Sequence, residues 1–153
     1  MRLKLPRIQR RPKLVYIADS WRDTIGMAQR PDLLPFFDVI QDCIESGHEL
    51  PRWAYRKGIG VTHDELLEED GIMHLHLGSR DSNELLYLIQ YADHVAYLEI
   101  NNHLHFTTKP IGAVLRRFHA KAVDRVEARI AGEVADRLRT VKTSIAKGLL
   151  PKR

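Results

Sequence analysis

Residues 71–106, with the sequence GIMHLHLGSRDSNELLYLIQYADHVAYLEINNHLHF, decide the predicted fold of this chain. The stretch holds three apolar segments separated by short turn-prone links: 72–78, 84–91 and 94–100. Apolar segments of this length, joined by short links rich in Ser, Asp and Asn, are typical of consecutive antiparallel strands. The stretch therefore predicts a three-stranded meander.

The register of this meander follows from its second link, Ala92-Asp93. If these residues form a tight hairpin loop, Ile89 faces Ala96, and a first hairpin centred near Asp81 extends the same face. That face is almost wholly apolar and comprises Met73, Leu75, Leu77, Leu85, Tyr87, Ile89, Ala96, Leu98 and Ile100. The other face then carries His74, His76, Leu86, Leu88, Gln90, Tyr97 and Glu99. A slip of one residue would bury the histidines and expose aliphatic side chains, so we favour the first register.

Two His-x-His pairs bracket the predicted sheet, His74 with His76 and His103 with His105. Side chains two residues apart in a strand point to the same face, so each pair is local. If the chain stays extended after the third strand, His103 and His105 share the parity of Glu99. We therefore expect four imidazoles on one surface of the sheet, with Tyr97 and Glu99 beside them.

Helical patterns lie on both sides of the meander in the sequence. Before it we expect a strand at 14–17, a helix from Asp19 or Ser20 through Ile25, a helix at 36–46 that ends at Gly47, and a short helical turn capped by Thr62 or Asp64. After it, apolar residues at three- and four-residue steps from 113 to 146 predict one long helix or two in sequence.

The predicted fold class is therefore α+β: a twisted antiparallel sheet with N-terminal helices and a long C-terminal helix. A chain of 153 residues is long enough for one ordinary domain. We place a basic N-terminal arm at 1–13, a single α+β domain at 14–147 and a basic tail at 148–153.

Charge is segregated along the chain, although the net charge is only +4. Residues 1–30 hold eight Lys or Arg against two Asp or Glu, residues 31–108 hold four against fourteen, and residues 109–153 hold twelve against four. A polyanion would be held by the termini and not by the centre. Long solvated helices are often basic as well, so charge alone leaves both interpretations open.

The sequence lacks the marks of a membrane or secreted protein. No apolar run approaches the roughly 20 residues that span a bilayer, and the basic start is not followed by the apolar segment of a secretory signal. A single cysteine, Cys43, provides no disulfide framework and indicates a buried thiol. We expect a soluble, cytoplasmic protein with no membrane partner.

Four features in fixed order carry a family resemblance. The first is the helix that ends at Gly47, followed by Leu50-Pro51 and a link through Arg56-Lys57-Gly58. The second is the His74-Leu-His76-Leu77 segment, which opens the sheet. The third is the polar hairpin that leads into strand 84–91 with its tyrosine, and the fourth is the strand 95–100, followed by a histidine-bearing segment and a basic helix. Together they resemble the YafO-type toxins of bacterial type II toxin–antitoxin pairs, within the RelE/ParE-like group. The likeness covers roughly residues 14–139. Residues 101–106 depart from the family pattern, and the arm and tail look like additions.

The resemblance implies a small RelE-like α+β fold and endoribonuclease activity on messenger RNA, typically at the ribosome. It also implies a cognate antitoxin that holds the protein inactive. It supports His74 and His76 better than the second pair.

Metal-free RNA cleavage needs a base for the 2′-hydroxyl proton, an acid for the leaving 5′-oxygen and positive charge at the phosphate. An imidazole titrates near neutral pH and can act as either acid or base. The catalytic candidates are His74, His76, Glu99, His103 and His105; which histidine is acid and which is base stays open. The candidates for contacts with RNA phosphates and riboses are Arg80, Tyr97, Lys109, Arg116 and Arg117, and the candidates for stacking on bases are Trp53, Tyr55 and Phe106.

Two other interpretations stay open. The four histidines with Glu99 are donors that suit zinc or iron, although their spacing matches no familiar zinc signature. The chain can also be a non-catalytic module whose arm and C-terminal helix bind nucleic acid or protein. We favour RNA cleavage by acid–base chemistry, and on that interpretation we expect neither a metal nor a cofactor.

Overall fold

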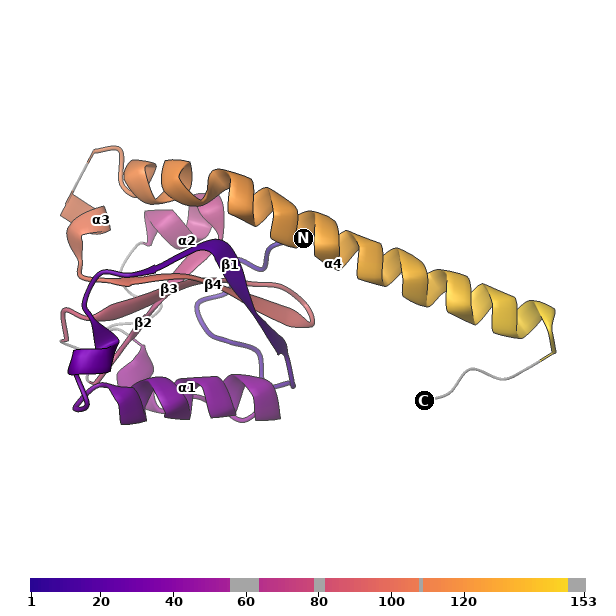
Figure 1. The fold of residues 1–153 in the computed structure, drawn as a ribbon, viewed down its shortest axis with the longest axis horizontal. Helices are drawn as coiled ribbons and strands as arrows, with labels where there is room; N and C mark the ends of the chain where they lie inside the picture. The colour runs from indigo at the N-terminus through magenta and orange to yellow at the C-terminus, as the bar shows by residue number, and fades with distance from the viewer. Residues whose placement is uncertain (56–63, 79–81, 108, 149–153) are drawn as a thin grey trace.

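The computed structural model describes residues 1–55, 64–78, 82–107 and 109–148. Its helices and strands follow one another in the order β1 (Leu14–Asp23), α1 (Leu34–Ser46), α2 (Glu65–Asp70), β2 (Ile72–His76), β3 (Leu85–Gln90), β4 (His94–Asn101), α3 (Leu104–Thr107) and α4 (Ala113–Ala146). Short 3₁₀ turns lie at Met27–Gln29 and Arg52–Ala54. The fold is α+β, as predicted, with one sheet between two helical layers (Figure 1).

The sheet has the strand order β1-β4-β3-β2. Strands β2, β3 and β4 form the predicted antiparallel meander, but β1 pairs with β4 in parallel, so the sheet is mixed and not antiparallel throughout. Strand β1 also continues to Asp23, so the helix expected from Asp19 or Ser20 is wrong. Arg22 pairs with Glu99 across a register shift in β1. Pairing with the open edge of β4 overrides the local helical pattern of these residues.

The register differs from the prediction by one residue in the first hairpin. His74 lies opposite Tyr87. The second hairpin begins as predicted, with Ile89 opposite Ala96, but a bulge places Tyr87 opposite Glu99 and not Leu98. A bulge inserts one extra residue into one strand, so the side-chain alternation shifts beyond it. His74 and His76 therefore share a face with alternate residues of β3 that were expected on the opposite, apolar face, namely Leu85, Tyr87 and Ile89.

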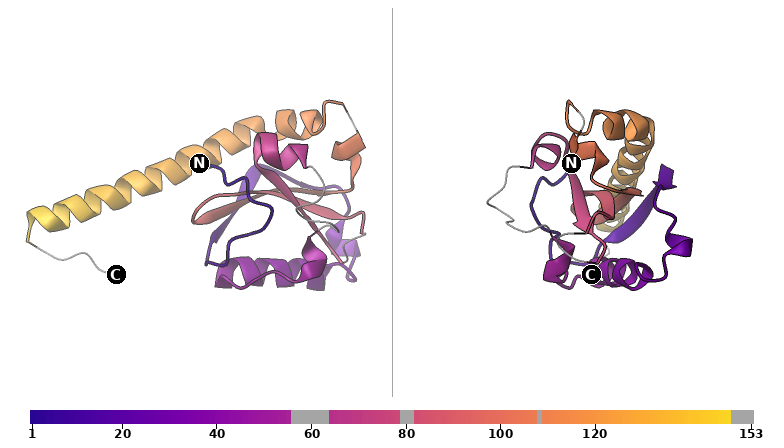
Figure 2. Two further views of the ribbon diagram at one scale, coloured as in Figure 1. Left: turned by 180° about the vertical axis from the view of Figure 1, so that it is seen from behind. Right: turned by 90° about the vertical axis from the view of Figure 1, so that its left-hand side faces the viewer.

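Both faces of the sheet are covered by helices. Helix α1 lies on one face and the first part of α4 on the other, as the views from behind and from the end also show (Figure 2). Every residue of β2, β3 and β4 is buried as a result. Strands covered on both faces are near-continuously apolar, which explains the sequence Leu85–Ile89. The histidine-bearing face is therefore not an open surface.

Residues 1–13 are part of the folded body and not a free arm. The Leu3 amide donates to the Gln90 carbonyl at 2.8 Å, and Ile8 is only 5% exposed. The Lys13 ammonium is buried and donates to the carbonyls of Tyr91 and Ala92 at 2.6 and 2.8 Å. Burial lowers the pKa of Lys13 to about 8. The basic segment 1–13 is therefore held against the sheet, and the division of the chain at residue 14 stays a prediction.

The ends of helices α1 and α2 lie where nearby residues in the sequence predicted them. Helix α1 ends at Gly47, whose left-handed φ of 77° closes the helix with a hydrogen bond from its amide to the Cys43 carbonyl. Asp64 caps α2 by accepting from the Leu67 amide at 3.2 Å. Helix α4 is a single helix of 34 residues. None of the helices in the described ranges has the length and apolarity needed to cross a membrane.

Candidate functional site

The chain turns sharply after Asn101, so the expected extended course through His103 and His105 is wrong. The Asn102 side chain accepts a hydrogen bond from the Leu104 amide at 2.8 Å and starts the short helix α3. Helix α3 brings His105 back against the α4 side of the sheet, where its Nε2 lies 2.9 Å from Glu99 Oε2. The five catalytic candidates thus gather on the α4 side of the sheet, in two adjoining groups.

The first group, the histidine cluster, consists of His74, His76 and His103 around Phe106. The ring centres are 5.6 Å apart for His74 and His76, 5.8 Å for His76 and His103, and 6.5 Å for His74 and His103. The Phe106 ring lies edge-on to His74, with the two centres 4.7 Å apart. Asp64, the N-cap of α2, places Oδ2 3.8 Å from His74 Nδ1. Three imidazoles and one carboxylate therefore lie close together.

Exposure separates the members of this cluster. His74 and His76 are buried, at 7% and 2% exposed, whereas His103 is half-buried on the turn between β4 and α3. Burial lowers the pKa of His103 below its ordinary value. His103 is therefore neutral at pH 7 and able to accept a proton.

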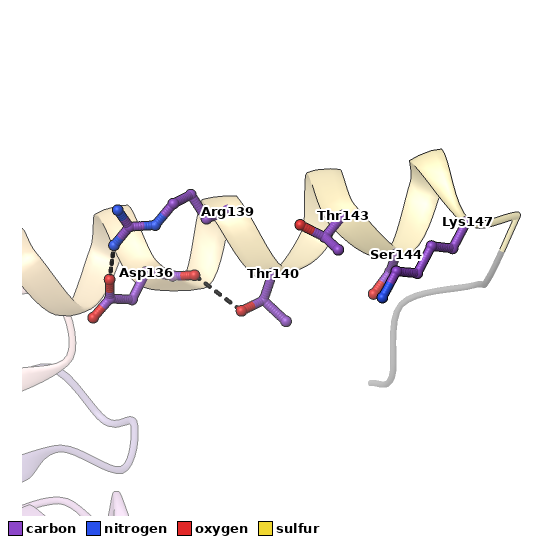
Figure 3. Close-up of a pocket in the computed structure, with 6 residues that line it drawn as sticks. All are labelled: Asp136, Arg139, Thr140, Thr143, Ser144 and Lys147. Atoms are coloured by element: carbon purple, nitrogen blue, oxygen red, sulfur yellow. Dashed lines mark hydrogen bonds and ion pairs between the residues drawn. The ribbon is translucent and has the colours of Figure 1, made fainter.

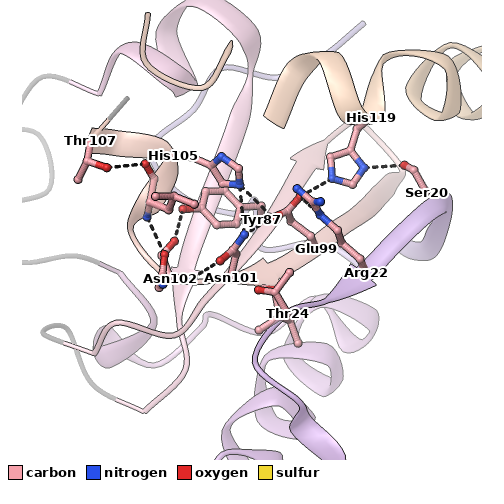
Figure 4. Close-up of polar contacts among 12 residues, drawn as sticks. Ser20, Arg22, Thr24, Tyr87, Glu99, Asn101, Asn102, His105, Thr107 and His119 are labelled. Atoms are coloured by element: carbon pink, nitrogen blue, oxygen red, sulfur yellow. Dashed lines mark hydrogen bonds and ion pairs between the residues drawn. The ribbon is translucent and has the colours of Figure 1, made fainter. Parts of the chain in front are cut away.

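The second group, the Glu99 network, is centred on Glu99 (Figure 4). Glu99 is fully buried, and its carboxylate accepts four hydrogen bonds. They come from Arg22 Nε at 3.0 Å and His119 Nε2 at 2.6 Å on Oε1, and from Asn101 Nδ2 at 2.8 Å and His105 Nε2 at 2.9 Å on Oε2. Ser20 Oγ completes the network at 2.5 Å from His119 Nδ1.

These contacts fix the protonation of the Glu99 network. Burial alone would raise the pKa of Glu99, but the hydrogen bonds from His105, His119, Asn101 and Arg22 outweigh it and hold that pKa well below its ordinary value. His105 Nδ1 is buried and has no hydrogen-bond partner among the described residues, so we assign its proton to Nε2. On the same assignment, the Ser20 hydroxyl donates to His119 Nδ1. Arg22 is then the cation that balances the Glu99 carboxylate.

Tyr87 connects the two groups. Its ring centre lies 5.2 Å from that of His105 and 6.4 Å from that of His74. Its hydroxyl donates to the Asn102 carbonyl at 2.8 Å, next to His103. Burial raises the pKa of Tyr87, so the hydroxyl stays protonated and keeps this hydrogen bond at all ordinary pH values. The turn that carries His103 is thus held in place by two hydrogen bonds, from the Tyr87 hydroxyl to the Asn102 carbonyl and from Asn101 Nδ2 to Glu99.

The residues predicted to contact the substrate are scattered. Tyr97 lies on the α1 face of the sheet, with its ring centre 5.7 Å from that of Phe37, so the expectation that it shares a face with Glu99 is wrong. The bulge between Tyr87 and Leu88 causes this separation. Arg116 donates to Asp70 at 2.7 Å. Lys109 and Arg117 are exposed near the start of α4, and Arg80 lies outside the described residues.

The three stacking candidates also separate. Phe106 lies in the histidine cluster, whereas Trp53 and Tyr55 belong to the core on the α1 side. The Trp53 ring packs edge-on against Phe36, with the centres 5.0 Å apart. Of these aromatic rings, Phe106 is the one placed to contact a base beside His103.

Sequence reasoning missed Ser20, Arg22 and His119, which complete the Glu99 network. A signal for His119 was present, because it falls on the apolar stripe of α4 between Leu115 and Ala122, where an ionisable residue must find a buried partner. No such signal existed for Ser20 and Arg22, since a helix was expected from Asp19 or Ser20 through Ile25.

Comparisons with known proteins add no family assignment. No protein-family model matches the chain, and no curated protein or solved structure matches it significantly. Within the described ranges, no group of three or more His, Cys, Asp or Glu side chains has an arrangement that could hold a metal ion. The geometry of the site is therefore the only guide to its chemistry.

Proposed function

We propose that this chain is an endoribonuclease of the YafO-type, RelE/ParE-like toxin class, which cleaves messenger RNA at the ribosome by general acid–base chemistry and is held inactive by a cognate antitoxin. The observation that carries the proposal is the histidine cluster: both His-x-His pairs contribute to one polar site, and a half-buried imidazole leads into it. Two imidazoles at one site can supply the base and the acid that metal-free RNA cleavage requires.

His103 is the general base in this proposal. It takes the proton of a ribose 2′-hydroxyl, whose oxygen then attacks the adjacent phosphorus atom. Its pKa, lowered by burial, keeps it neutral and ready to accept that proton at pH 7. The bond from phosphorus to the 5′-oxygen breaks, and a 2′,3′-cyclic phosphate forms.

His74 is the general acid that protonates the leaving 5′-oxygen. The carboxylate of Asp64 lies beside it, with Oδ2 3.8 Å from His74 Nδ1. His76, between His74 and His103, completes the set of proton-transfer groups. Lys109 and Arg117, both exposed near the start of α4, supply positive charge for the RNA backbone. Phe106 offers a ring on which a base stacks.

Induced expression in a bacterial host tests the proposal. We expect the wild-type chain to arrest growth and to shorten cellular messenger RNA, and the His103→Ala variant to do neither. His48→Ala is the matched control, because His48 is an exposed histidine after α1, away from the cluster, and this variant should arrest growth as wild type does. Intact messenger RNA on induction of the wild type, or full arrest by folded His103→Ala at equal expression, would contradict the proposal.

A further inference from the structure

The second half of α4 leaves the body of the protein. The buried residues of α4 all precede residue 127, and the helix then extends beyond the sheet (Figures 1 and 2). We call residues 134–147 the projecting segment. An isolated helix of this length is marginal in water, so packing against another surface would stabilise it.

The projecting segment carries an unpartnered apolar stripe. Val134, Leu138 and Ile145 are 45%, 57% and 62% exposed, and Val141 lies between them at the spacing of a packed helix seam. By helical geometry the stripe lies about a quarter turn from the face with which α4 packs on the sheet through Val126. The opposite side is polar, as the six labelled side chains in Figure 3 show. The projecting segment thus has an apolar side that stays exposed.

Charge indicates what covers this stripe. Arg137 and Lys142 flank it on its two sides by helical geometry; Arg137 Nη1 also lies 3.9 Å from Asp93 Oδ2 of the same chain, in a pair that is exposed on both sides. The segment as a whole has four basic residues against one acidic residue, Asp136. Two copies of the segment paired directly would bring like charges together. The partner surface must be acidic and partly apolar.

The outer face of α1 has these properties. Helix α1 contains no Lys or Arg, and its exposed side carries Asp38, Asp42 and Glu45. Leu34 and Val39, each 39% exposed, add apolar surface to the same helix. The chain therefore presents a basic apolar helix and an acidic helix on opposite sides of one sheet (Figure 1).

We propose that the chain forms a two-fold symmetric dimer in which the projecting segment of each copy packs on the outer face of α1 of the other. Because α1 and α4 cover opposite faces of the sheet, a two-fold rotation that sets the two bodies side by side brings each projecting segment over the partner's α1. The contact is reciprocal and closed, as is usual for soluble dimers. This proposal goes beyond RNA cleavage and does not depend on it.

Sedimentation velocity of the full chain over a range of protein concentrations and ionic strengths tests the dimer. We expect a dimer that weakens as salt is added. Leu138→Asp should raise the dimer dissociation constant about tenfold or more by placing a charge in the stripe. Val114→Asp is the matched control on the outer side of the same helix, where Val114 is 46% exposed, and it should leave the dimer intact.

Charge reversal tests the identity of the two surfaces. Asp38→Lys with Asp42→Lys should weaken the dimer about tenfold or more, and so should Arg137→Glu with Lys142→Glu. Combining all four substitutions should restore it, because the charges are again complementary. A monomer at every concentration in low salt, an equal loss from Val114→Asp and Leu138→Asp, or a failure of the combined variant to recover would overturn the proposal.

Discussion

Replacing Glu99 by Gln is expected to lower the free energy of unfolding at pH 7 by about 3 kcal/mol or more. The fully buried carboxylate accepts hydrogen bonds from four side chains that come from β1, β4, α3 and α4. The amide of glutamine has one oxygen and no charge, so Arg22 would be left without its counter-ion. Chemical denaturation measures the change. Glu49→Gln, which removes an exposed carboxylate 3.4 Å from Arg7, should change stability by about 0.5 kcal/mol or less.

Wild type and Glu99→Gln should also differ in how their free energy of unfolding depends on pH. The folded-state pKa of Glu99 is lowered, so its stabilising contribution is present above the unfolded-state pKa of about 4.3 and is lost as the pH falls through the folded value. The stability difference between wild type and Glu99→Gln should therefore shrink below about pH 5. A difference that stays constant from neutral to acidic pH would show that Glu99 is not held ionised by its neighbours.

Replacing His103 by Ala is expected to reduce the rate of RNA cleavage by about 10²- to 10⁴-fold, the contribution of a positioned general base. The substitution should slow the chemical step and leave the fold intact. His103 is half-buried, and hydrogen bonds of Tyr87 and Glu99 hold the turn that carries it without the His103 side chain. The control His48→Ala should cleave at the wild-type rate.

The pH dependence of cleavage tests whether His103 is the general base. Burial lowers the pKa of His103, and the base must be neutral to act, so wild-type activity should fall on the acid side with a midpoint below pH 6.5. The residual activity of His103→Ala should lack this acid limb. An acid limb that survives in the variant would assign the base to another residue.

Local patterns predicted much of the fold from the sequence. The three strands of the meander and the end of α1 at Gly47 depend on neighbours within a few residues, and so do the cap of α2 and the helical pattern of α4. For these last two the sequence left alternatives, Thr62 or Asp64 and one helix or two, and the structure has Asp64 and a single helix. Features that depend on distant residues were not predictable in this way. Strand β1 was taken for a helix after residue 17, because its strand form requires the edge of β4, far along the chain.

The candidate site shows the same division. The spacing of His74 and His76 correctly placed that pair on one face, whereas the turn into α3 divides His103 and His105 between the two groups; all five candidates lie on the α4 side of the sheet. Their burial was not foreseen, because it requires α4 to cover that face. His119 reaches Glu99 from twenty positions later in the chain, with their hydrogen-bonded atoms 2.6 Å apart, a contact set by helix packing and not by spacing.

The chemistry of the cleaved RNA ends tests the central claim most directly. Purified full-length protein is incubated with translating ribosomes in the presence of a metal chelator, and the new ends of the messenger RNA are identified. Acid–base cleavage at the histidine cluster predicts 2′,3′-cyclic phosphate and 5′-hydroxyl ends, formed at a rate that the chelator does not change and that His103→Ala lowers by about 10²- to 10⁴-fold. Ends with 3′-hydroxyl and 5′-phosphate groups, or cleavage lost with the chelator, would contradict it.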